Sequence, residues 1–293
     1  DIDTNIWTWG DGTFQENLCS FDKKGIKVAD GMMTLSIEKV EVPAHLSYSE
    51  SNNDGPQKVD KRDYRCGELQ SKDIYRYGIL EVRMKTPRTK AGKQNSGFVG
   101  SMFTFRQPKW ELWEEIDYEV QAQHDGHFTS NLIFGKGCGD WWCTRMWGSW
   151  EGHSDSKGTH TPEVSPPLKT PDNYSHSGEF HVIKIVWNPE HIQWFLDGVK
   201  YRELKQTDIT TMPAKDGHIG IKNKETRIPE GYAKLMFNFW ITNTGKAFGG
   251  ENDGNDYPME AQYDWFHYYS LDGYDKPYKK HPTAPFDYGY TRT

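Results

Sequence analysis

Three acidic side chains alternate along one short segment of the chain, residues 113–120. The sequence there is Trp-Glu-Glu-Ile-Asp-Tyr-Glu-Val, which places Glu115, Asp117 and Glu119 two residues apart. Alternate residues of a β-strand share a face, so a strand here gathers the three carboxylates and leaves the apolar residues for a core. Like charges on one face destabilise a strand. The pattern therefore indicates either a chemical function or a solvated acidic edge strand.

Cleavage of a glycosidic bond is a reaction that needs carboxyl groups in such an arrangement. One ionised carboxylate attacks the anomeric carbon, and one protonated carboxyl gives its proton to the leaving oxygen. We predict that Glu115 is the nucleophile and Glu119 the general acid/base. Their Cα atoms would lie about 13 Å apart, but long side chains that lean inward can approach the separation of about 5 Å that retention requires. Asp117 between them can share a proton with the nucleophile.

Short β-strands are the elements that the rest of the sequence predicts. Runs rich in Val, Ile, Tyr, Phe and Trp alternate with clusters of Gly, Pro, Asn and Asp. Asp30-Gly31 and Asp197-Gly198 are favoured two-residue hairpin turns. The predicted fold class is all-β, a jelly-roll sandwich of two packed antiparallel sheets with an open substrate cleft on the concave face. The predicted strands span residues 25–28, 32–38, 67–71, 78–85, 97–105, 115–121, 128–134, 180–187, 191–196, 218–221, 233–241 and 261–269.

The chain is expected to form a single domain over residues 1–293, since sandwiches of this length occur as one unit. Two stretches are predicted to be long loops, at about 42–62 and 135–179. The second carries Trp141, Trp142, Trp147 and Trp150 in a background rich in Gly, Ser and Pro. Long loops in compact domains are usually functional or disordered, and this one is too aromatic for disorder. We interpret it as a wall of the cleft.

Composition and charge exclude some classes of partner. Aromatic residues make up 14% of the chain, and they can supply a core or stack on sugar rings. The formal net charge is −7 and no basic stripe is present, which argues against nucleic acid. No run of about 18 apolar residues is available to span a bilayer, and the first residues lack a charged and apolar leader. We expect a soluble monomer, already processed if it is exported.

The carboxylate segment resembles glycoside hydrolase family 16, in particular the bacterial lichenases, which are 1,3-1,4-β-glucanases. Its lichenase counterpart reads Trp-Asp-Glu-Ile-Asp-Ile-Glu, and the three residues between Glu115 and Glu119 match the branch without a bulge. Laminarinases, agarases and κ-carrageenases have one extra residue there. Further segments that resemble the family lie at residues 66–71, 74–78, 81–85, 180–187, 192–198 and 263–265.

The resemblance implies a secreted, retaining endo-β-glycoside hydrolase that acts on a polysaccharide such as mixed-linkage β-glucan. The sugar-contacting residues that it implies are Asn17, Glu68, Phe103, Trp113, Asn131, Asn238 and Trp240. Each of them is also a credible structural residue, and the two tryptophans suit a core. Lichenases usually have Arg, Tyr and Tyr where this chain has Gln70, Phe105 and Ile133. An ionic donor and two hydroxyls are therefore expected to be missing from the cleft, which bears on the choice of sugar.

The resemblance also implies a disulfide between Cys19 and Cys66, which suits an extracellular or periplasmic location. Cys138 and Cys143 are near enough in sequence for a second bridge; a zinc pair is the weaker alternative. His124 and His127 flank Asp-Gly and are interpreted as a turn rather than a metal pair.

No cofactor is expected for catalysis, but the family implies a structural calcium ion on the convex side. The matching positions are the carbonyl of Gly31 and the carboxylate of Asp264, and oxygen ligands of this kind suit a hard cation. A plain turn at Gly31 and a hydrogen-bonded strand residue at Asp264 are the alternative.

Three other functions compete with β-glucan hydrolysis. The first is hydrolysis of red-algal galactans such as agar, porphyran or carrageenan, which basic residues in the cleft would favour where the polymer is sulfated. The second is transglycosylation, which uses the same catalytic residues. The third is a non-catalytic, lectin-like sandwich that binds glycans. It predicts the loss of a catalytic carboxylate, whereas Glu115, Asp117 and Glu119 are all present.

Overall fold

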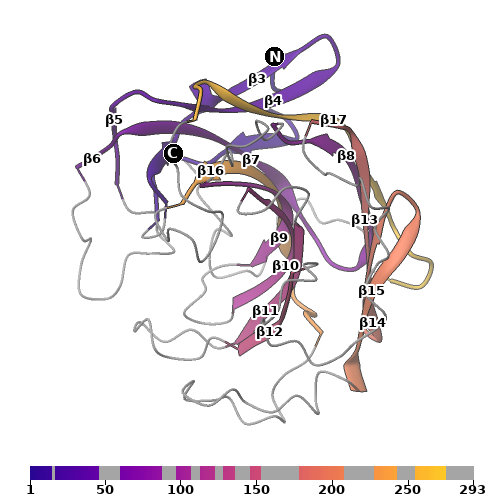
Figure 1. Ribbon diagram of the computed structural model, residues 1–293. Coiled ribbons are helices and arrows are strands. Elements are labelled where there is room, and N and C mark those ends of the chain that lie inside the picture. The colour runs from indigo at the N-terminus through magenta and orange to yellow at the C-terminus, as the bar shows by residue number, and fades with distance from the viewer. Residues whose placement is uncertain are drawn as a thin grey trace.

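Two curved antiparallel sheets make up the described part of the computed structural model, and the outer sheet wraps around the inner one (Figure 1). Side chains of both sheets fill the core between them. Within the described ranges, no helix is long and apolar enough to cross a lipid bilayer. The structure describes residues 1–14, 17–45, 60–87, 97–106, 113–122, 128–135, 146–152, 178–207, 228–242 and 255–274.

The inner sheet carries the carboxylate segment near its middle. Its strands run in the order β12 (Met146–Gly152), β11 (Phe128–Gly135), β10 (Trp113–Gln121), β9 (Phe98–Arg106), β16 (Ala233–Ile241), β7 (Tyr64–Tyr75) and β1 (Trp7–Trp9). The outer sheet continues from the start of β7 through β4 (Met32–Glu38), β17 (Met259–Tyr269), β8 (Gly78–Lys85), β13 (His181–Trp187), β14 (His191–Leu196) and β15 (Val199–Lys205). Its flanking elements are β2 (Cys19–Phe21), η1 (Lys23–Gly25) and β3 (Ile26–Ala29), and β5 (Val42–Pro43) pairs with β6 (Lys61–Arg62) alone.

Strand β7 belongs to both sheets and joins them at one corner. Cys66 pairs with β4 of the outer sheet, whereas the next residue, Gly67, pairs with β16 of the inner sheet. A Cβ atom on Gly67 would lie 2.3 Å from the carbonyl oxygen of Gly25, so the corner requires glycine. Cys19 and Cys66 form a disulfide here, with Cα atoms 5.8 Å apart, as the sequence resemblance implies.

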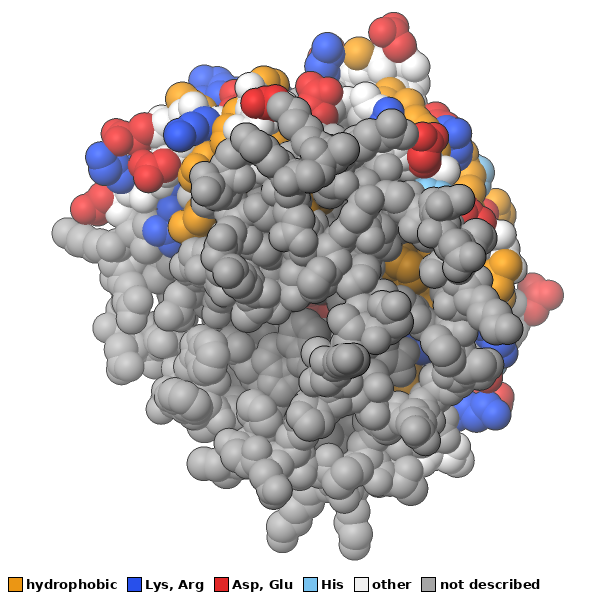
Figure 2. Space-filling model, in the orientation of Figure 1, with side chains coloured by type: hydrophobic (Ala, Val, Ile, Leu, Met, Phe, Trp, Pro, Cys, Tyr) orange, Lys and Arg blue, Asp and Glu red, His pale blue; other side chains and the backbone are white. Residues whose placement is uncertain are grey.

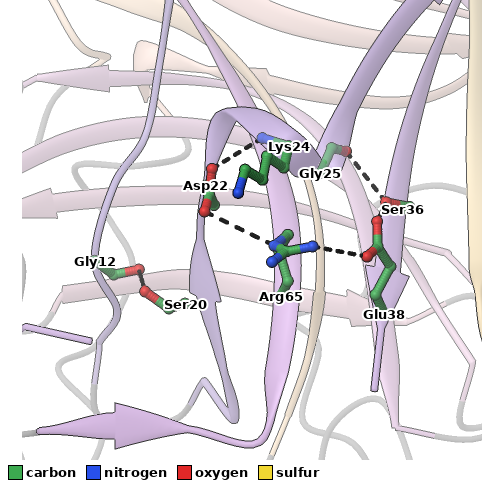
Figure 3. Close-up of polar contacts among 8 residues, drawn as sticks. All are labelled: Gly12, Ser20, Asp22, Lys24, Gly25, Ser36, Glu38 and Arg65. Carbon is green, nitrogen blue, oxygen red and sulfur yellow. Dashed lines mark hydrogen bonds and ion pairs between the residues drawn. The ribbon is translucent and has the colours of Figure 1, made fainter. Parts of the chain in front are cut away.

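An arginine beside this corner ties three outer elements together (Figure 3). The Arg65 Nη1 atom lies 2.9 Å from Glu38 Oε2 on β4, and its Nε atom lies 3.7 Å from Asp22 Oδ2 before η1. Asp22 Oδ1 also accepts a hydrogen bond from the main-chain N–H of Lys24, which caps the short helix. The point at which the chain changes sheets is thus held by a disulfide on one side and by charged pairs on the other.

Strand β10 is regular over its whole length. Its pairing with β9 and with β11 shows no register shift, so the absence of a bulge that the sequence indicates is confirmed. Ile116, Tyr118 and Val120 are buried in the core between the sheets. Asp117 and its alternate neighbours Glu115 and Glu119 consequently face the opposite, concave side.

Donors from the outer sheet hold the inner strands from behind. The indole N–H of Trp194, on β14, donates to the main-chain carbonyl of Asp117 at 3.0 Å. The hydroxyl of Tyr263, on β17, lies 3.1 Å from the carbonyl of Ser101 and 3.2 Å from that of Asn238. Both side chains are buried. These cross-sheet hydrogen bonds reach residues on β10, β9 and β16 whose side chains line the concave face.

A buried carboxylate anchors the first residues of β10. Glu114 is 1% exposed, and its Oε2 atom accepts hydrogen bonds from Arg106 Nη1 at 2.8 Å and from the N–H of Gly231 at 3.0 Å. The N–H of Glu230 lies 3.3 Å from Oε1. A Cβ atom on Gly231 would collide with both the guanidinium and the carboxylate. Glu114 therefore links β10 to β9 and to the segment that leads into β16.

Most of the predicted elements are confirmed, and two predicted loops are partly wrong. The Asp30-Gly31 and Asp197-Gly198 pairs form hairpin turns with positive φ at both residues, as a type I′ turn requires. However, β12 lies inside the predicted loop 135–179, because it pairs with β11 as an edge strand. The predicted loop 42–62 begins and ends with the paired strands β5 and β6. The predicted strand 218–221 lies outside the described residues.

Replacing the Glu114 carboxylate is expected to destabilise the fold. The Glu114→Ala variant removes the acceptor of Arg106 and of two main-chain N–H groups, and should lower the free energy of unfolding by about 3 kcal/mol. Denaturant unfolding measures this change. Glu190→Ala, which removes an exposed carboxylate, is the matched control and should stay within about 0.5 kcal/mol of wild type. Equal stability of the two variants would contradict an anchoring role for Glu114.

Candidate active site

The registers of five inner strands align the side chains of the concave face in three rows. The first row contains Glu115, Phe105, Lys234 and Ile74. The second contains Asn131, Asp117, Phe103, Met236 and Gln70. The third contains Glu119, Ser101, Asn238 and Glu68. The three carboxylates of β10 thus lie opposite the amide, aromatic and carboxylate residues that the sequence resemblance assigns to sugar binding.

Asp117 is the most enclosed of the three carboxylates on β10. It is 3% exposed, whereas Glu115 and Glu119 are half-buried. Burial raises the pKa of Asp117 well above its ordinary value, and the charges of Glu115 and Glu119 raise it further. A side-chain hydrogen bond to Glu115 also favours the protonated form, while one from Asn131 opposes it. Burial and the neighbouring carboxylates therefore favour the protonated form of Asp117, with a hydrogen bond to Glu115.

Glu68 stands at the far end of the third row and has a raised pKa as well. Burial raises its pKa to about 7, and hydrogen bonds from Gln70 and Asn238 together with the charge of Lys234 limit the rise. Gln70 Nε2 donates to Glu68 Oε1 at 2.8 Å, and Asn238 Nδ2 lies 3.3 Å from Oε2. The hydroxyl of Ser101 donates to Asn238 Oδ1. Three strands thus contribute to one buried polar network.

The other predicted sugar contacts divide into two groups. Phe103, Phe105 and Asn131 lie in the rows beside the carboxylates of β10. Trp240 lies on β16, but its ring is buried and packs edge-on against Phe14 at 4.8 Å, which favours the core interpretation.

Asn17 is fully buried, and its Oδ1 atom accepts the main-chain N–H of Cys19 at 2.9 Å. Its Nδ2 atom has no hydrogen-bond partner among the described residues. Several residues singled out in the sequence lie outside the described part of the structure. They are the side chains of Trp113 and Ile133 and the residues Trp141, Trp142, Cys138, Cys143, His124 and His127.

Two polar residues of the rows were missed by reasoning from the sequence. Lys234 and Ser101 face the concave side, and Lys234 places a positive charge next to Gln70, the position where an ionic donor is expected to be missing. Strand parity contained the signal, because Lys234 stands an even number of residues from Asn238 and Ser101 stands two from Phe103.

Gly31 and Asp264, the two residues expected to bind calcium, lie near paired strands of the outer sheet, but the Asp264 carboxylate already has a partner. Gly31 lies in the turn before β4, and Asp264 follows Tyr263, which pairs with Met33 of that strand. The Asp264 Oδ2 atom lies 2.5 Å from Arg83 Nη1, so a guanidinium already holds this carboxylate. No group of three metal-binding side chains occurs among the described residues. Calcium binding at Gly31 and Asp264 stays a prediction.

Comparisons with known proteins identify the family of this chain. The model of glycosyl hydrolases family 16 matches residues 14–223. A β-glucanase of Paenibacillus polymyxa is 28% identical over 225 residues, which cover 74% of this chain and 72% of the relative. A β-glucanase of Paenibacillus macerans is also 28% identical, over 71% of this chain and 65% of the relative. The solved Bacillus licheniformis β-glucanase has a TM-score of 0.61 at 20% identity and covers 92% of this chain and 95% of its own, so it shows the same fold. Because the family model matches more than half of the sequence, this chain belongs to glycosyl hydrolases family 16.

Proposed function

We propose that this glycoside hydrolase is an endo-acting β-glucanase that cleaves a neutral polysaccharide with retention of configuration. The observation that carries the proposal is the regular strand β10, which presents Glu115, Asp117 and Glu119 in three successive rows of the concave face. The relatives that it resembles are β-glucanases. A mixed-linkage 1,3-1,4-β-glucan is the substrate that we favour, because β10 lacks the bulge of the laminarinase and galactanase branch.

In the proposed mechanism, an oxygen of Glu115 attacks the anomeric carbon while the glycosidic C–O bond breaks. Glu119 gives its proton to the leaving oxygen. In the second step, ionised Glu119 takes a proton from water, whose oxygen attacks the same carbon and releases Glu115. Asp117 supports both steps, since its proton makes a hydrogen bond to Glu115 and lowers the repulsion between three adjacent carboxylates.

The charges along the cleft favour a neutral polymer over a sulfated galactan. Among the described residues of the three rows, Glu68 and the three carboxylates of β10 face a single cation, Lys234. A sulfated chain would meet more negative than positive groups there. On the face in Figure 2, the described acidic and basic side chains are interspersed along the edge, with no patch of one sign.

The remaining expectations concern location and competing functions. The Cys19–Cys66 disulfide supports secretion, because such bonds persist in oxidising compartments. Transglycosylation uses the same three carboxylates and differs only in whether water or a sugar hydroxyl attacks in the second step. The non-catalytic interpretation is disfavoured because a binding module has no need to keep Asp117 buried between two carboxylates.

Activity on a panel of polymers tests the proposal. Wild type is expected to release reducing ends from lichenan in preference to laminarin, xyloglucan, agarose, porphyran and κ-carrageenan. Glu115→Ala should lower the rate by about 1000-fold or more, because the covalent route is lost. Glu81→Gln, which changes a carboxylate on the outer sheet, is the control and should keep wild-type activity. Preference for a galactan would overturn the proposed substrate, and full activity of Glu115→Ala would overturn the nucleophile.

The raised pKa of Asp117 predicts how stability depends on pH. The protonated Asp117 side chain makes its full contribution to stability below the pKa of the unfolded state, near 3.8. This contribution is lost as the pH rises through the higher pKa of the folded state. Asp117→Asn stays uncharged at every pH, so its Tm relative to wild type should increase from pH 4 to pH 8. Thermal unfolding across this range measures the difference. Glu260→Gln, an exposed carboxyl on β17, should show no such trend. Parallel Tm curves for Asp117→Asn and wild type would refute a buried, protonated Asp117.

A further inference from the structure

One lysine lies on the concave face of the inner sheet, on the same face of β16 as Asn238. Lys234 pairs in register with Phe105 of β9 and so stands in the row of Glu115. Lys234 is only 5% exposed, and its Nζ atom donates a hydrogen bond to Gln70 Oε1 at 3.3 Å. Burying a lysine is costly unless the ammonium group has partners. The burial of the Lys234 ammonium among carboxylates and amides therefore indicates a functional role for this residue.

A chain of hydrogen bonds leads from this lysine to a carboxylate. Gln70 accepts from Lys234 through its oxygen and donates through its nitrogen to Glu68 Oε1, so the amide has a single orientation. Gly10 lies against the carboxylate, and a Cβ atom there would be 2.3 Å from Oε1. Each carboxylate oxygen has two lone pairs, so Glu68 can accept further hydrogen bonds.

We propose that Lys234 is a positioning residue that, through Gln70, holds the Glu68 carboxylate as an acceptor for sugar hydroxyls on the donor side of the cleft. The inference rests on the proposed glucanase function. Lys234 brings a positive charge next to Gln70 from the neighbouring strand β16.

The charges around Glu68 allow the role of Lys234 to be tested through the pH dependence of activity. The charged groups that act on Glu68 are Glu115 from β10, which raises its pKa, and Lys234 from β16, which lowers it. With Lys234 present, burial still raises the pKa of Glu68 to about 7. Loss of Lys234 should therefore leave Glu68 protonated over more of the working pH range, and a protonated carboxyl is a poorer acceptor.

The test compares Lys234→Met with Lys234→Arg on the polymer that wild type cleaves best. Lys234→Met should raise KM about tenfold, the equivalent of one charge-assisted hydrogen bond, with kcat changed much less. The fall of kcat/KM on the acid side should also begin at a higher pH than in wild type. Lys234→Arg keeps the charge and should restore most of both properties. A purely structural lysine would lower Tm without moving the pH profile.

Two further variants keep the inference falsifiable if Lys234→Met folds poorly. Gln70→Leu breaks the link while it leaves the ammonium in place, and should also raise KM. In a Glu68→Gln background, which removes the titrating group, Lys234→Met should no longer move the acid side of the profile. Unchanged KM in Gln70→Leu, or the same pH shift in the Glu68→Gln background, would overturn the inference while glucanase activity stands. Inactivity of wild type on every polymer would instead contradict the proposed function, and the inference with it.

Discussion

Repulsion among carboxylates that share one strand face is the constraint on which this site depends. Glu115, Asp117 and Glu119 stand in adjacent rows of a regular strand, and Asp117 in the middle is buried. Three negative charges cannot be accommodated there without a large cost. Protonation of Asp117 relieves the repulsion, and the proton makes a hydrogen bond to Glu115. The same arrangement leaves one ionised carboxylate beside one that can carry a proton, which is what two-step glycoside hydrolysis requires.

The register of such a strand must be fixed, because a shift of one residue would point every carboxylate toward the core. The architecture opposes a slip at several points. Trp194 holds the carbonyl of Asp117 from the outer sheet, and Glu114 anchors the start of β10 to β9 and to the segment before β16. Apolar residues between the carboxylates fill the core between the sheets. Packing, cross-sheet hydrogen bonds and a buried ion pair therefore all support the same register.

Local patterns in the sequence were enough to predict much of the fold. The bounds of β4, β8, β14 and β16 agree with prediction, because alternating apolar residues end at clear turns. The two Asp-Gly hairpins follow from the backbone demands of the turn itself. Strands β1 and β2 have three residues each, too few to show a period, and β12 lies in a stretch rich in glycine and tryptophan.

The three carboxylates of β10 could be proposed as catalytic from the sequence because their relation is local, two residues apart on one strand. The network around Glu68 was not, since it depends on how distant strands pair. Lys234 and Gln70 are 164 residues apart, and the bond from Gly231 to Glu114 spans 117 residues. Glu114 stands in the sequence motif where the lichenase counterpart has Asp, yet only its partners reveal an anchor. Charge balance in the cleft is likewise a property of the assembled sheet.

The stereochemistry of the first product tests the central claim most directly. Proton NMR of wild-type digestion, recorded within the first minutes and before mutarotation, distinguishes the two anomers of the newly formed reducing end. We expect the β-anomer first, because two displacements at one carbon restore its configuration. Initial release of the α-anomer would show a single displacement, and would contradict the assignment of Glu115 as a nucleophile that forms a covalent intermediate.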